Sequence, residues 1–112
     1  MKKVCVVISR DSLGKGPEEL GQILVKSFIY SLSELEVAPR ELVFFNSGVK
    51  LVAEGANTVN DIKALQEKGT EILVCGTCSN YYGIQDKLGV GSISNMGEIS
   101  KRMVSADSVV NI

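Results

Sequence analysis

Five short segments with the character of β-strands recur along the chain, and stretches with helical periodicity separate them. The segments cover residues 3–8, 41–45, 71–75, 90–93 and 108–112. Their apolar and β-branched residues are typical of strands buried inside a sheet. Strands that alternate with helices form parallel βαβ units, and helices then cover both faces of the sheet. The sequence therefore predicts an α/β fold, a layered sandwich of about five mainly parallel strands.

The helices of this fold have recognisable ends. The first is expected to open at Pro17, with two acidic residues in its first turn. The second is expected to begin at Thr58, with Asp61 three residues later in a variant of the capping box, and to end at residues 68–69. The last is expected over residues 95–105. Apolar residues at helical spacing predict the buried face of the first helix: Leu20, Ile23, Leu24, Phe28, Leu32 and Leu35.

Composition limits the partners and the location of the protein. A chain of 112 residues forms one domain, residues 1–112. The formal net charge is −1 and the basic residues are scattered, so binding to nucleic acid is not expected. No stretch approaches the roughly 18 apolar residues that cross a membrane. Three cysteines, an odd number, fit a reducing compartment, and we expect a cytoplasmic protein.

The chain contains no histidine. This excludes Ser-His-Asp and Cys-His hydrolase mechanisms and every zinc site that needs an imidazole. The loop with Gly14 and Gly16 lacks a full phosphate-binding or dinucleotide-binding pattern, so no nucleotide is expected. We therefore expect neither a cofactor nor a metal ion.

The third predicted strand runs directly into Cys75-Gly76-Thr77-Cys78, and a helix should open at Thr77 or Cys78. This helix is expected to break at Gly83, with residues 84–88 continuing it. A turn of this kind places two thiols at a helix N-terminus, where unsatisfied N–H groups favour thiolate over thiol. Four roles remain open: a thioredoxin-like dithiol, half of a metal site shared between subunits, a buried structural pair, and a thiolate that carries sulfur as a persulfide. Only Pro17 and Pro39 are present, and neither is placed to face a thioredoxin-like dithiol.

Other polar residues are expected at the same edge of the sheet, because ligands collect at the carboxyl ends of parallel strands. Arg10 and Asp11 follow the first strand, and a cation there would lower the pKa of a thiol. Asn46 and Ser47 follow the second strand and could donate hydrogen bonds to a bound sulfur species. A further edge loop holds two candidate pocket residues, Asn95 and Met96. For each group, an ordinary turn or a solvated loop is the alternative interpretation.

The segment Cys75-Gly76-Thr77-Cys78-Ser79-Asn80-Tyr81-Tyr82-Gly83 resembles the cysteine loop of the DsrE-like sulfur-relay family, most closely the DsrE-like domain of the YedF group. Several other stretches match in the right order: residues 9–16, 19–21, 45–51, 87–91 and 94–96. The resemblance implies a three-layer, flavodoxin-like fold that assembles as a trimer or hexamer. It also implies a link to selenium metabolism.

The same resemblance implies roles for the loop residues. A sulfur-carrying cysteine in such relatives stands a short helix before a glycine, which points to Cys75 because of its relation to Gly83. Cys78 is then a resolving or assisting thiol, and Gly76 and Thr77 support the site. Proteins of the YedF group usually also carry an N-terminal TusA-like domain, which is not found in these 112 residues. We expect either that a separate TusA-like protein is the partner or that this sequence is an excised domain.

The leading hypothesis is a sulfur-relay protein, a sulfurtransferase or sulfur carrier, that takes sulfur or selenium from a donor protein and passes it to an acceptor protein. One alternative is a non-catalytic oligomeric module that binds a small ligand or partner in the same pocket. A dithiol oxidoreductase is the third.

Overall fold

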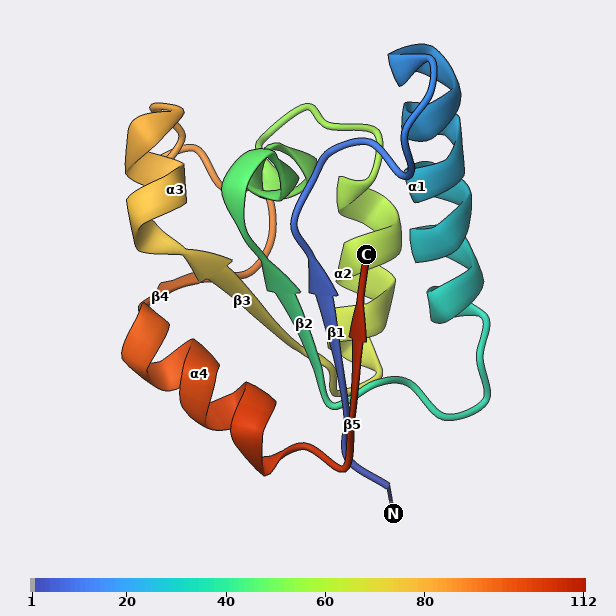
Figure 1. Ribbon diagram of the computed structural model, residues 1–112, viewed down its shortest axis with the longest axis vertical. Helices are drawn as coiled ribbons and strands as arrows, with labels where there is room; N and C mark the ends of the chain where they lie inside the picture. Colours follow the sequence, from blue (N-terminus) through green and yellow to red (C-terminus); the bar gives the residue numbers. More distant parts are fainter. Residues whose placement is uncertain (1) are drawn as a thin grey trace.

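The computed structural model describes residues 2–112 and contains one five-stranded sheet. The strands lie in the order β4-β3-β2-β1-β5, and every neighbouring pair is parallel (Figure 1). The strands are β1 (Val4–Ile8), β2 (Glu41–Phe44), β3 (Glu71–Cys75), β4 (Ser92–Ser94) and β5 (Ser108–Asn111). The α/β fold predicted from the sequence is confirmed.

Helices cover both faces of the sheet. They are α1 (Glu18–Ser33), the 3₁₀ helix η1 (Asn46–Val52), α2 (Val59–Glu67), α3 (Gly76–Tyr81) and α4 (Met96–Ser105). Figure 1 shows α1 and α2 on one face and α4 on the opposite face. Among residues 2–112, no helix is long and apolar enough to span a membrane.

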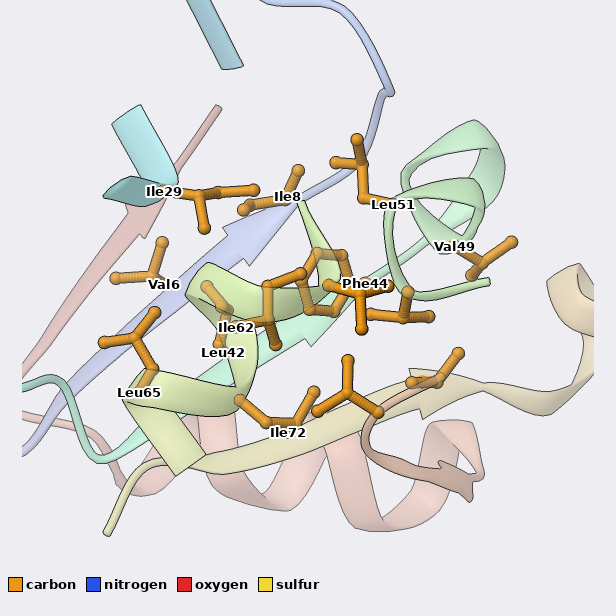
Figure 2. Packing of buried hydrophobic residues seen from close by; sticks show 14 of the residues in the cluster. Val6, Ile8, Ile29, Leu42, Phe44, Val49, Leu51, Ile62, Leu65 and Ile72 are labelled. Carbon is orange, nitrogen blue, oxygen red and sulfur yellow. The ribbon is translucent and has the colours of Figure 1, made fainter. Parts of the chain in front are cut away.

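Alternation along the strands divides the core into two clusters. In β1, Val6 and Ile8 pack with α1 and α2, whereas Cys5 and Val7 pack with Ile99 of α4. Figure 2 shows the larger cluster, in which Phe44, Ile62 and Leu65 are fully buried. Burial of each such side chain contributes about 1.5–3 kcal/mol, so the α1–α2 face supplies most of the apolar stabilisation.

The predicted buried face of α1 is confirmed in part: Leu32 is buried and Phe28 packs against the core. Its buried residues are Gly21, Val25, Ile29, Leu32 and Ser33, and four of the predicted core residues are exposed: Leu20, Ile23, Leu24 and Leu35. The helix is apolar on more than one side, so spacing alone did not fix its rotation. Gly21 fixes it, because a Cβ there would lie 1.9 Å from Ser12 Oγ, and its carbonyl accepts the Leu13 N–H at 2.9 Å.

Two local predictions are also corrected. Thr58 is fully buried and its hydroxyl donates to the Leu51 carbonyl, so it ties α2 to η1 and forms no capping box. Residues 84–88 form turns and one bridge to Ala53, not a continued helix. Gly83, with φ of +69°, ends the α3 segment as expected.

Arg102 of α4 anchors this helix to the sheet. Its guanidinium binds Glu71 through two hydrogen bonds of 2.6 and 3.0 Å, Glu41 at 3.1 Å and Glu98 at 2.9 Å. Glu41 is fully buried and also pairs with Arg40. Hydrogen bonding to Arg102 holds the pKa of Glu71 below its ordinary value. Because Ile99 is the only buried residue of α4, this ion-pair network is a major part of the helix's attachment.

Candidate functional site

A pocket of about 370 Å³ opens at the carboxyl-terminal edge of the sheet, between η1 and α3. Its lining residues are Asn46, Thr77, Cys78, Tyr81 and Tyr82. The segments that follow β2 and β3 supply all of them, as expected for the functional edge of a parallel sheet. The structure therefore brings together the predicted residues Asn46, Thr77 and Cys78.

Cys78 lines this pocket. It is half-buried, and its sulfur accepts a hydrogen bond from the backbone N–H of Asn46 at 3.0 Å. Burial raises the pKa of the Cys78 thiol, the Asn46 N–H lowers it, and the neighbouring Cys75 thiol raises it. Burial is the largest of these effects, and the pKa of Cys78 lies above its ordinary value of 9.0. Burial thus opposes the thiolate that the helix N-terminus is expected to favour.

Cys75 does not line the pocket. It is the last residue of β3, it is 3% exposed, and it packs in the cluster that contains Ile99 of α4. Its carbonyl accepts the Ser79 hydroxyl at 2.8 Å, which fixes the turn from strand to helix. The two thiols of the loop therefore differ in access, with Cys78 open to the pocket and Cys75 covered.

Gly76 allows the chain to pass close to β4. A Cβ at this position would lie 3.1 Å from both the Ile93 side chain and the Ser94 carbonyl. Its role in the structure is to permit this approach, whereas Thr77, the next residue, lines the pocket.

Asn46 has a left-handed backbone, with φ of +49°, and it is the only residue other than glycine with positive φ in the described part of the chain. Its side-chain oxygen accepts a hydrogen bond from the Tyr82 hydroxyl at 3.1 Å. The Lys50 ammonium lies 4.6 Å from the centre of the Tyr82 ring. These contacts of Tyr82 and Lys50 were not predicted, because they join residues far apart in the sequence.

The other predicted site residues lie outside the Cys78 pocket. Arg10 is exposed, and the Asp11 N–H donates to the Ser47 hydroxyl at 3.2 Å, which ties the loop after β1 to η1. Asn95 caps α4 by accepting the Glu98 N–H at 2.9 Å, and Met96 is an exposed residue of the first turn. Asp11, Ser47 and Asn95 therefore have structural roles in loops and a helix cap. None of these predicted residues lines the Cys78 pocket.

Metal ligands are not assembled in the described range. Within residues 2–112 there is no group of three His, Cys, Asp or Glu side chains that could hold a metal ion.

A model of the DsrE/DsrF-like family matches residues 2–112. The chain belongs to the DsrE/DsrF-like family. This confirms the resemblance to the DsrE-like family, while the closer similarity to the YedF group stays a prediction. A search of the curated proteins found no significant match.

Solved structures of similar fold agree with this assignment. The YchN protein from E. coli has a TM-score of 0.74 and 20% sequence identity, with 100% of each chain covered. A protein of unknown function, MTH1491 from Methanobacterium thermoautotrophicum, has a TM-score of 0.72 and 22% identity, again with 100% of each chain covered. A third, BT1422 from Bacteroides thetaiotaomicron, has a TM-score of 0.66 and 14% identity over 98% of this chain and 95% of that one. At these identities the likeness concerns the fold.

Proposed function

We propose that this DsrE/DsrF-like protein carries sulfane sulfur as a persulfide on its Cys75–Cys78 loop and passes it to a partner protein. The observation that carries the proposal is the half-buried Cys78 sulfur in a pocket, held by the Asn46 N–H at 3.0 Å. Membership of the family is consistent with a role in sulfur relay.

The loading step is thiol–persulfide exchange. The cysteine thiol first loses its proton to solvent, and the thiolate attacks the outer sulfur of a donor persulfide, R–S–SH. One S–S bond forms as the S–S bond of the donor breaks, and the donor leaves as R–S⁻, which takes up a proton. Transfer to an acceptor thiolate is the same exchange and needs no outside oxidant or reductant.

The second thiol of the loop offers a release step. Its thiolate attacks the inner sulfur of the persulfide, forms a Cys75–Cys78 disulfide and expels HS⁻. A dithiol reductant then restores both thiols. This step gives the same disulfide whichever cysteine is loaded first.

Access supports Cys78 as the cysteine that is loaded, with Cys75 as the assisting thiol. A donor must bring its sulfur in line with the attacking atom, and Cys75 is 3% exposed beneath α4. This order is the reverse of the one that the resemblance implies from the relation between Cys75 and Gly83. The two orders predict different sulfur loading in the single variants Cys75→Ser and Cys78→Ser.

A sulfur donor and an acceptor, such as a TusA-like protein, would exchange sulfur at the pocket, and selenium is the alternative element. Exposed apolar residues on α1, which include Leu20, Ile23 and Leu24, support assembly into the homo-trimer or homo-hexamer expected from the resemblance.

The test is sulfur loading from inorganic polysulfide, followed by alkylation and mass spectrometry of the peptides. We expect Cys78→Ser to abolish persulfide on the loop, and Cys75→Ser to load sulfur but release less HS⁻. Cys5→Ala is the matched control, because Cys5 is fully buried in β1, and it should load like the wild type.

The outcomes separate the alternatives. Loss of loading in Cys75→Ser but not in Cys78→Ser would restore the order implied by the resemblance. Wild-type loading in both single variants would overturn the proposal and favour a binding module with spectator thiols.

A further inference from the structure

Three hydrogen bonds join Cys78, Asn46 and Tyr82 in a closed ring, and the Cys78 sulfur is one member of it. Tyr82 follows Cys78 by one helical turn, and its backbone N–H donates to the Cys78 carbonyl at 3.1 Å. The Tyr82 hydroxyl reaches across to the side chain of Asn46, whose own backbone N–H returns to the Cys78 sulfur. The ring therefore links α3 and η1 through one side-chain hydroxyl.

The Asn46 N–H is available to the sulfur because of its position. Asn46 is the first residue of η1, and the first N–H groups of a helix have no partner within that helix. Asn46 also has a left-handed backbone, with φ of +49°. A left-handed residue other than glycine costs on the order of 1 kcal/mol or more and persists only where the surroundings hold it.

The side chain of Tyr82 is the contact that holds Asn46. The hydroxyl binds Asn46 Oδ1 at 3.1 Å, and the ring is itself fixed on two sides. Lys50 lies over it at 4.6 Å, and the Tyr81 ring meets it edge-on with 5.1 Å between centroids. The hydroxyl is thus directed at Asn46 by packing that does not involve Cys78.

We propose that Tyr82 is a positioning residue for the sulfur chemistry of Cys78, acting through Asn46. This role rests on the proposed sulfur-relay function. Tyr82 fixes the Asn46 N–H against the sulfur, which favours the attacking thiolate in a site where burial disfavours it. It also orients the sulfur toward the pocket.

The effects of the neighbouring groups on the pKa of Cys78 agree with this role. The Asn46 N–H is the interaction that lowers the pKa of Cys78 against burial and against Cys75. The other titratable groups around the pocket are the phenols of Tyr81, the last residue of α3, and of Tyr82, its C-cap, and the Lys50 ammonium on η1. Loss of the N–H bond therefore raises the pKa of Cys78 further.

The test compares the pH profile of Cys78 alkylation by iodoacetamide in the wild type and in Tyr82→Phe, with the site identified by peptide mass spectrometry. We expect the profile to move to higher pH and the rate at neutral pH to fall by about threefold, the effect of one weakened hydrogen bond. Tyr30→Phe is the matched control. It removes a hydroxyl on α1 whose recorded partner is Glu34, so its profile should match the wild type.

A double-mutant cycle tests the route through Asn46. Asn46→Gly keeps the N–H and allows the left-handed backbone but removes the side chain that Tyr82 holds. In that background Tyr82→Phe should have no further effect. An equal effect in both backgrounds, or no shift in Tyr82→Phe at all, would overturn the role of Tyr82.

Alkylation requires no persulfide, so the two proposals fail separately. A shifted profile without any sulfur loading would overturn the sulfur-relay function, whereas normal loading with an unshifted profile would overturn the positioning role.

Discussion

The backbone N–H of Asn46 donates to the sulfur of Cys78 at 3.0 Å, across a separation of 32 residues. This contact makes the end of β2 and the start of α3 parts of one site. It also means that the reactivity of Cys78 depends on the structure of η1 as well as on its own helix.

The first prediction concerns the pH dependence of Cys78. Because burial raises its pKa above the ordinary 9.0, the thiolate fraction keeps growing as pH rises past that value. We expect the iodoacetamide rate at Cys78 to rise up to and beyond pH 9.0, and to be lower at neutral pH than for the same cysteine in urea-unfolded protein. A rate that reaches its plateau below pH 9.0 would contradict this.

The second prediction concerns Gly48 of η1, the helix that presents Asn46. A Cβ at Gly48 would lie 2.3 Å from the Ile8 carbonyl oxygen, which is backbone and cannot turn aside. We expect Gly48→Ala to lower the free energy of unfolding by about 1–3 kcal/mol or more, measured by urea denaturation. Gly16→Ala is the control, because nothing lies within 4 Å of its Cβ position, and it should be near neutral. Equal stability of the two variants would refute the close-approach argument.

The third prediction concerns Arg102. Arg102→Met leaves the fully buried Glu41 with Arg40 as its remaining cation and frees Glu71. We expect a loss of about 1.5–3 kcal/mol in the free energy of unfolding, since the buried carboxylate of Glu41 loses one of its two cations and a charge-assisted hydrogen bond. Lys101→Met changes the exposed neighbouring residue of α4 and should fall within about 0.5 kcal/mol of the wild type. A neutral Arg102→Met would show that the network does not stabilise the fold.

The fourth prediction concerns Cys5 in β1, whose pKa is raised to about 11, first by burial and then by Glu41. Between 9.0, its ordinary value, and about 11, the unfolded chain releases this proton while the folded chain keeps it. Stability should therefore fall as pH rises through this window, by up to about 1.4 kcal/mol per pH unit, and be unaffected below it.

Cys5→Ala should remove that part of the decline. Urea denaturation of both proteins across the window isolates the Cys5 contribution, because the other alkaline groups are common to both. Parallel curves for the wild type and the variant would contradict the assignment.

Much of the fold could be predicted because it depends on local pattern. The strand at residues 71–75 matched its predicted bounds, and the helix predicted over residues 95–105 matched α4 together with its N-cap, Asn95. The rotation of α1 could not be predicted, because it depends on the approach of Gly21 to Ser12 in a preceding loop. The local pattern therefore predicted where the elements begin and end, whereas a non-local contact determined which face of α1 is buried.

The site divides in the same way. The sequence pointed to Cys78, Thr77 and Asn46, because strand ends and cysteine spacing are local signals. It gave no signal for the hydrogen bond from Tyr82 to Asn46, which joins residues 36 apart in the chain. The effect of burial on the pKa of Cys78 could not be predicted either, since burial depends on how the whole chain packs.

The unequal cover of the two thiols has a practical consequence for handling the protein. Oxidants such as peroxide act on accessible sulfur, so sulfenic acid should form first at Cys78, and the covered Cys75 thiol should then attack it to give the Cys75–Cys78 disulfide and water. Oxidation of a stored sample would then be found in this loop, and Cys5, fully buried in β1, would serve as the internal reference.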